Sequence, residues 1–165
     1  MPAGPDEKTL ARVLTNEDAT RAFARQLAEV LEPGLLITLS GQLAAGKTFL
    51  VRALLGALGH EGKVKSPTST LVETYSLPGF TVHHFDLYRL ADGQELHFMG
   101  FDDYLRPTTV CLIEWPERGG AALPVPDLHL TLEVLDAERR GLSLVAGTST
   151  GRRLLARLES ASSKT

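Results

Sequence analysis

The fold is decided by one stretch of the sequence, Leu35-Leu36-Ile37-Thr38-Leu39-Ser40-Gly41-Gln42-Leu43-Ala44-Ala45-Gly46-Lys47-Thr48. Residues 35–39 form a short, nearly continuous apolar run, which is typical of a strand buried on both faces of a parallel sheet. A glycine-rich turn follows, and the sequence after it predicts a helix over residues 47–58 that ends at Gly59. A strand, a turn and a helix in this order indicate an α/β protein.

The turn at residues 41–48 matches G-x-x-x-x-G-K-[ST], the phosphate-binding pattern called the P-loop. Its glycines let successive backbone amides face one point, and the helix that follows presents unpaired N–H groups to a phosphate. Lys47 supplies a mobile charge for the β- and γ-phosphates, and Thr48 offers Mg²⁺ a hydroxyl ligand. The candidate nucleotide-binding residues are Gly41, Gln42, Leu43, Ala44, Ala45, Gly46, Lys47 and Thr48.

The metal of a P-loop protein also needs a carboxylate at the tip of a neighbouring strand. Asp86 follows the strand-like run 82–85, and Glu114 follows the apolar run 110–113. The pattern does not decide between them, and we expect one to bind the metal and the other to position water. Residues 66–70 carry hydroxyls where many P-loop hydrolases sense the γ-phosphate, although a simple proline-containing turn has the same composition.

The other predicted elements complete a three-layer α/β/α P-loop fold around a mostly parallel sheet, with an antiparallel portion on one side from the later strands. The length indicates one domain over residues 1–165, with residues 1–8 as a short leader. The expected elements are a helix over 16–31, strands over 71–75 and 80–85, a short helix over 92–98, strands over 128–134 and 142–145, and a helix over 152–158.

The composition excludes several classes of protein. No apolar run reaches the ~18 residues of a membrane span, and the N-terminus lacks the apolar core of a signal peptide, so we expect a cytoplasmic protein without membrane contact. The net charge is -3 and no basic stripe is visible, so any contact with nucleic acid should be indirect. Cys111 is the one cysteine, which excludes an internal disulfide and suggests a small buried apolar residue.

With these residues assembled, the chain resembles the TsaE family, the small ATPases of bacterial tRNA threonylcarbamoyladenosine biosynthesis. The matching segments follow the family's order over roughly residues 15–126, and their combination is far more specific than the P-loop alone. They are residues 41–48, Val64-Lys65-Ser66-Pro67-Thr68, Thr70-Leu71-Val72-Glu73, His84-Phe85-Asp86-Leu87-Tyr88-Arg89-Leu90, Gly100-Phe101, Asp103-Tyr104 and Ile113-Glu114-Trp115-Pro116.

The resemblance implies that ATP and Mg²⁺ are the cofactors and that TsaD and TsaB are the partners. In the family, those partners place threonylcarbamoyl on adenosine 37 of tRNAs that read codons beginning with A, while the ATPase resets their complex. The residue roles implied are phosphate binding by Lys47, Mg²⁺ binding by Thr48 and Glu114, water positioning or γ-phosphate sensing by Asp86, a switch-loop hydroxyl at Thr68, and places beside the nucleotide for Trp115, Glu17 and Arg139.

The sequence departs from the family pattern at two places that concern this site. Ala44 stands where the loop usually has glycine, and a positive φ there would cost an alanine on the order of 1 kcal/mol. Ser69 stands where the family usually has an aromatic residue, which bears on how the hydroxyl-rich loop packs.

Three alternatives stay open at this point. A small-molecule kinase would use Asp86 and Arg89 on its phosphoryl acceptor, but no arginine-rich lid segment is visible. A GTPase would need an Asn-Lys-x-Asp motif, and the single asparagine is Asn16. A module that binds nucleotide without turnover is the third. No arginine finger is evident, so we expect weak hydrolysis by the chain alone.

Overall fold

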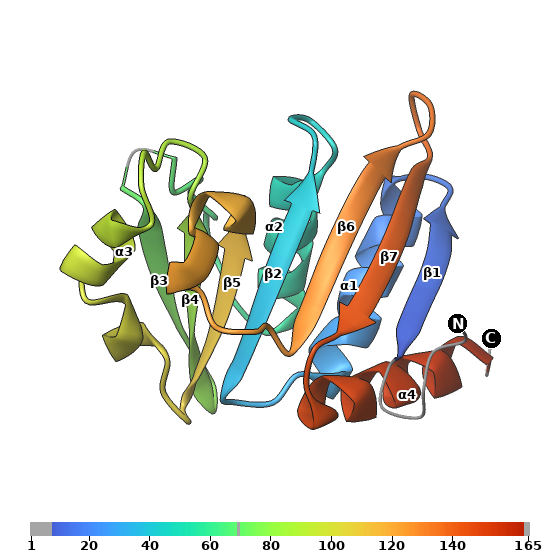
Figure 1. Ribbon diagram of the computed structural model, residues 1–165. Helices are drawn as coiled ribbons and strands as arrows, with labels where there is room; N and C mark the ends of the chain where they lie inside the picture. Colours follow the sequence, from blue (N-terminus) through green and yellow to red (C-terminus); the bar gives the residue numbers. More distant parts are fainter. Residues whose placement is uncertain (1–7, 69, 164–165) are drawn as a thin grey trace.

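A computed structural model describes residues 8–68 and 70–163 and contains one seven-stranded sheet with the strand order β1-β7-β6-β2-β5-β4-β3 (Figure 1). The strands are β1 (Thr9–Leu14), β2 (Leu35–Gly41), β3 (Val72–Leu77), β4 (Phe80–Asp86), β5 (Thr109–Glu114), β6 (Leu128–Val134) and β7 (Arg140–Ala146). The helices are α1 (Glu17–Val30), α2 (Lys47–Ala57), α3 (Gln94–Phe98) and α4 (Ser149–Ser163).

The middle of the sheet is parallel and both of its edges are antiparallel. Strands β6, β2, β5 and β4 pair in parallel, whereas β7 and β1 add antiparallel pairs at one edge and β3 adds one at the other. The α/β class is therefore confirmed. The predicted antiparallel portion from the later strands is present, and the β3–β4 hairpin adds a second one.

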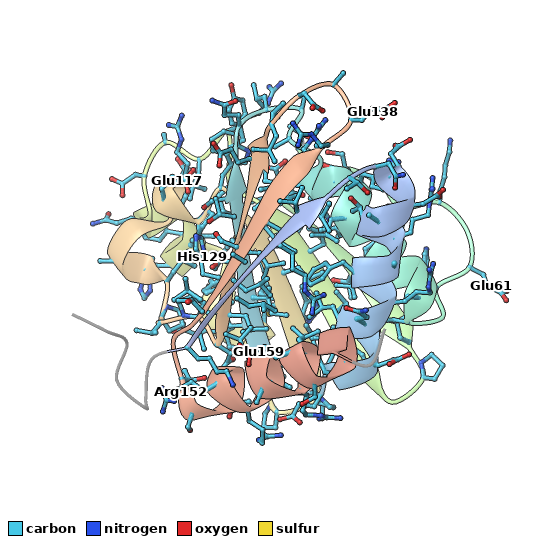
Figure 2. All side chains as sticks on the ribbon, turned by 90° about the vertical axis from the view of Figure 1, so that its right-hand side faces the viewer. Glu61, Glu117, His129, Glu138, Arg152 and Glu159 are labelled. Atoms are coloured by element: carbon cyan, nitrogen blue, oxygen red, sulfur yellow. The ribbon has the colours of Figure 1, made fainter. Side chains whose placement is uncertain are left out.

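Two layers of unequal size cover the sheet. Helices α1, α2 and α4 share the larger core with one face, through side chains such as Phe23, Leu54 and Leu155. The smaller core lies between the other face and the segment around α3, with Leu96 and Phe101 at its centre. Figure 2, turned by 90°, shows α1 on one side of the sheet and the segment that carries Glu117 on the other. The second layer does not extend over β1 and β7, so on that face of the sheet Val13 and Val145 are exposed.

The elements around the P-loop lie where the sequence predicts them. Helix α1 begins after Asn16, whose side chain caps it by accepting a hydrogen bond from Ala19 N at 2.9 Å. Helix α2 begins at Lys47 directly after the loop. The terminal helix α4 is longer than predicted at both ends. Helix α3 begins at Gln94, later than the predicted start at residue 92, and Gln94 N donates a hydrogen bond to Asp92 Oδ1 at 2.9 Å.

Strand β1 is the element that the sequence analysis missed. Its inward positions hold Leu10, Arg12 and Leu14, so a cation interrupts the apolar alternation that marks a strand. The Arg12 guanidinium is accommodated by hydrogen bonds to the Gln26 side chain at 2.6 Å and to Leu158 O at 2.9 Å.

Of the predicted leader, residues 1–7 lie outside the described residues. The Lys8 carbonyl accepts a hydrogen bond from Ala146 N, and its ammonium lies 3.2 Å from Glu159 Oε2. Among the helices of residues 8–68 and 70–163, none has the length and apolarity to cross a membrane.

Candidate nucleotide and metal site

The P-loop connects the end of β2 to the start of α2 at the carboxyl edge of the parallel strands. Gly41 has a φ of 153°, and a Cβ there would lie 2.6 Å from Leu132 O on β6. Gly46 has a φ of 104° and its carbonyl accepts the first helical hydrogen bond, from Leu50 N at 2.9 Å. Both positions therefore require glycine, one for close packing and one for its backbone conformation.

Backbone strain gathers at this site. Ala44 has a φ of 65°, the conformation that the sequence analysis identified as costly for alanine. The other non-glycine residues with positive φ in the described part of the chain are Trp115 at 57° and Leu71 at 71°. Trp115 lines the same pocket as Ala44, and the Leu71 carbonyl accepts a hydrogen bond from Asp86 N. Strain that the surrounding structure maintains is characteristic of functional sites.

A pocket of about 350 Å³ brings most of the predicted site residues together. The register of the parallel strands β4 and β5 sets Asp86 opposite Glu114, so both acids reach the same edge of the sheet. The lining residues include Leu43, Ala44, Ala45, Gly46, Lys47, Thr48, Ser66, Thr68, Asp86, Arg89, Glu114 and Trp115.

Lys47 contacts the backbone of the loop and the ring of Trp115. Its ammonium donates a hydrogen bond to the Gly41 carbonyl and lies 3.8 Å from the centre of the Trp115 ring. The side chain is only 5% exposed. Burial lowers the pKa of this ammonium, while the carboxylates of Glu114, Glu117 and Asp86 act in the opposite direction. The ammonium group of Lys47 thus lies close enough to Glu114 and Asp86 to interact with both carboxylates.

Glu114 has a partner that the sequence analysis did not assign. His84 Nε2 lies 2.6 Å from Glu114 Oε2, and both side chains are almost fully buried, at 0% and 2% exposure. His84 Nδ1 has no hydrogen-bond partner among the described residues. The sequence does contain one indication that His84 belongs to the site. His84 lies two residues before Asp86 and therefore faces the same side of β4. This contact fixes one carboxylate oxygen of Glu114 and leaves the other for a ligand.

Asp86 is less tightly held. One of its carboxylate oxygens, Oδ1, accepts a hydrogen bond from Tyr88 N at 3.0 Å. Burial raises the pKa of Asp86, and the bond from Tyr88 acts against that rise. Thr68 lies across the pocket, where its hydroxyl is 2.6 Å from that of Ser66. Ser69, which the sequence analysis singled out, lies outside the described residues.

A second, larger pocket of about 560 Å³ adjoins the first at Ala44, Ala45 and Gly46. Glu17, for which the resemblance implies a place beside the nucleotide, lines this larger pocket. Its other lining residues include Arg21, Phe49, Leu132, Glu138 and Arg140, and Figure 2 shows Glu138 at the tip of the β6–β7 turn. The two pockets together give room for a phosphate chain at the loop and a nucleoside beside it.

Three predicted residues lie away from these linings. Gly41 and Gln42 contribute carbonyls to the loop, which accept from Lys47 and from Ala45 N respectively. The structure places Arg139 outside both pockets, exposed and 2.7 Å from Asp136. Its neighbour Arg140 lines the larger pocket and donates from Nε to Ala45 O at 3.0 Å.

The donors suit magnesium better than a metal held entirely by protein. Within the described residues there is no cluster of three or more His, Cys, Asp or Glu side chains that could enclose an ion. The pocket instead offers the Thr48 hydroxyl with the Glu114 and Asp86 carboxylates. Mg²⁺ commonly binds through one or two carboxylates, the phosphates of a nucleotide and several waters, so these residues fit that ion.

Comparisons with known proteins agree with this geometry. A family model described as "Threonylcarbamoyl adenosine biosynthesis protein TsaE" matches residues 14–142. The tRNA threonylcarbamoyladenosine biosynthesis protein TsaE of Haemophilus influenzae is 41% identical, over 90% of this chain and 96% of its own length. The protein of the same name from Bacillus subtilis is 32% identical, over 79% and 82%. The crystal structure of Bacillus subtilis YdiB has a TM-score of 0.82 at 26% identity, over 96% of this chain and 99% of that one.

Proposed function

Because the chain belongs to the TsaE family of tRNA threonylcarbamoyladenosine biosynthesis proteins, we propose that it binds ATP with Mg²⁺ and hydrolyses it slowly in support of that modification. The observation that carries the proposal is the convergence of Lys47, Thr48, Asp86 and Glu114 on one pocket at the carboxyl edge of the sheet. This is where α/β sheets bind their ligands.

Each residue has a distinct task in this proposal. Lys47 exchanges the Gly41 carbonyl for the β- and γ-phosphates, which are stronger partners for an ammonium. Thr48 and Glu114 hold the metal, and Asp86 orients the attacking water. Bound Mg²⁺ neutralises the charge that develops on the phosphates. Thr68 lies where its hydroxyl could report the γ-phosphate to the loop around it.

The partners in the proposal are TsaB and TsaD, with adenosine 37 of tRNAs that read codons beginning with A as the modified base. The net charge of -3 supports an indirect role toward tRNA, with the partners contacting the nucleic acid. The proposed activity needs both ATP and tRNA, and the cytoplasm contains both, so the cytoplasm is its proposed location.

Reconstitution tests the proposal. Purified TsaB and TsaD from the same organism, together with this chain, tRNA, an activated threonylcarbamoyl donor and ATP, should sustain modification over many turnovers. ADP release by this chain should rise on adding TsaB–TsaD. Lys47→Ala should abolish both effects. Multiple turnover that continues without this chain, or ADP release that depends instead on a small-molecule acceptor, would contradict the proposal.

A further inference from the structure

A shallow groove of about 400 Å³ runs between α1 and α2, next to the larger nucleotide pocket. Figure 1 shows the two helices side by side on one face of the sheet. We call this the arginine groove, and its lining residues are Arg21, Arg25, Phe49, Arg52, Ala53 and Ala57. Three exposed guanidinium groups thus surround a floor of small and aromatic side chains.

The positive charge of the arginine groove is weakly compensated. Arg21 lies 2.7 Å from Asp18 on the same helix, and its guanidinium lies 5.1 Å from the centre of the Phe49 ring. Exposed pairs of this kind contribute only ~0–1 kcal/mol, so Arg21 can exchange partners. Arg25 and Arg52 make no hydrogen bond or ion pair with any residue that the structure describes.

We propose that the arginine groove binds an acidic, partly apolar segment of a partner protein. Guanidinium groups bind carboxylates through paired hydrogen bonds. Arg21 and Arg25 are one helical turn apart, which matches the spacing of two carboxylates on one face of a partner helix. The apolar floor made by Phe49, Ala53 and Ala57 gives room for an aliphatic side chain between the charges.

The observations favour a protein occupant over RNA. A nucleic-acid surface neutralises many phosphates along an extended basic stripe, whereas this groove has three cations. Glu17, Asp18 and Glu138 line the adjoining pocket and would repel a phosphate backbone that continued past the groove.

Position makes this surface relevant to the nucleotide. Arg21 and Phe49 line both the arginine groove and the larger pocket, so a segment bound in the groove touches residues that face the nucleotide. Binding of the partner and of ATP should then be coupled, and the coupling must be equal in both directions.

Reversing the charge of the groove tests this inference. The probe is the purified TsaB–TsaD pair of the same organism, so the test rests on the proposed function. Arg25→Glu and Arg52→Glu should each weaken binding of that pair at least about tenfold, and the difference should shrink as salt is raised. Arg106→Glu carries the same change in charge at an exposed position before β5, outside the groove, and should bind within twofold of the wild type. All three variants should keep wild-type thermal stability and ATP affinity.

The outcomes separate the inference from the function beneath it. If the wild type binds TsaB–TsaD and both groove variants bind equally well, the groove is not the docking surface. If the wild type does not bind TsaB–TsaD at all, the proposed partnership is wrong, and the docking of that pair in the arginine groove is wrong as well. Binding of tRNA alone that is lost in Arg25→Glu and Arg52→Glu would overturn the protein occupant in favour of RNA.

Discussion

Replacing His84 with phenylalanine should weaken the proposed metal site although it replaces neither of the proposed metal ligands, Thr48 and Glu114. The ring keeps much of its volume, but the bond of 2.6 Å from Nε2 to Glu114 Oε2 is lost. Hydrogen bonds to charged groups contribute ~1.5–3 kcal/mol, and loss of a partner that orients a metal ligand typically lowers metal affinity ~10–100-fold. Because Glu114 is only 2% exposed, water cannot easily replace the missing donor.

The assay is a Mn²⁺ titration followed by electron paramagnetic resonance in the presence of a non-hydrolysable ATP analogue. His84→Phe should bind Mn²⁺ about 10–100-fold more weakly than the wild type, and His84→Gln, which retains a donor, should recover part of that loss. The matched control is His83→Phe, because His83 is the neighbour that faces the other side of β4 and contacts Thr74 Oγ1 at 2.8 Å. Wild-type Mn²⁺ affinity in a folded His84→Phe protein would refute the assignment of Glu114 to the metal.

Two substitutions and one change of pH test the backbone and the core. Ala44→Gly should raise the free energy of unfolding by about 0.5–1 kcal/mol in urea titrations, because glycine adopts the positive φ of this position without strain. Gly41→Ala should lower it by about 2 kcal/mol or more, since its Cβ would meet Leu132 O at 2.6 Å. Burial raises the pKa of the Cys111 thiol to about 12. Between pH 8.5 and 10 the unfolded thiol, with a pKa of ~8.5, loses its proton while the native thiol keeps it, so this rise in pH should reduce the free energy of unfolding by about 1.6 kcal/mol through this group.

Matched variants identify each cause. Ala45→Gly, next to Ala44 but buried and without positive φ, should destabilise the protein. Gly56→Ala, whose Cβ would meet nothing within 4 Å, should stabilise helix α2. Cys111→Ala should remove the alkaline loss. Equal changes in stability for Ala44→Gly and Ala45→Gly would show that the positive φ of Ala44 is not strained. A pH dependence that is unchanged in Cys111→Ala would show that the thiol does not cause the alkaline loss.

The centre of the fold and most of the candidate site could be predicted because their signals are local. The strand, loop and helix of residues 35–58 are contiguous, and each position of the loop has its own chemical requirement. Asp86 and Glu114 are distant in sequence, but each ends an apolar strand, and the ends of parallel strands meet at one edge.

What the sequence could not provide depends on register and packing. The contact between His84 and Glu114 requires the alignment of β4 with β5, which no local pattern contains. Arg139 and Arg140 are adjacent, yet Arg139 ends the β6–β7 turn and pairs with Asp136 outside the pockets, whereas Arg140 begins β7 and reaches the P-loop. The arginine groove assembles from two helices, so a search for basic runs does not find it.

The most direct test of the account is a calorimetric titration of the protein with ATP in excess Mg²⁺. We predict saturable binding of one ATP per chain, lost or nearly lost in Lys47→Ala and unchanged in Lys63→Ala, where an exposed lysine outside both pockets is removed. Equal affinity of the wild type and Lys47→Ala would contradict the claim that residues 41–48 bind the nucleotide.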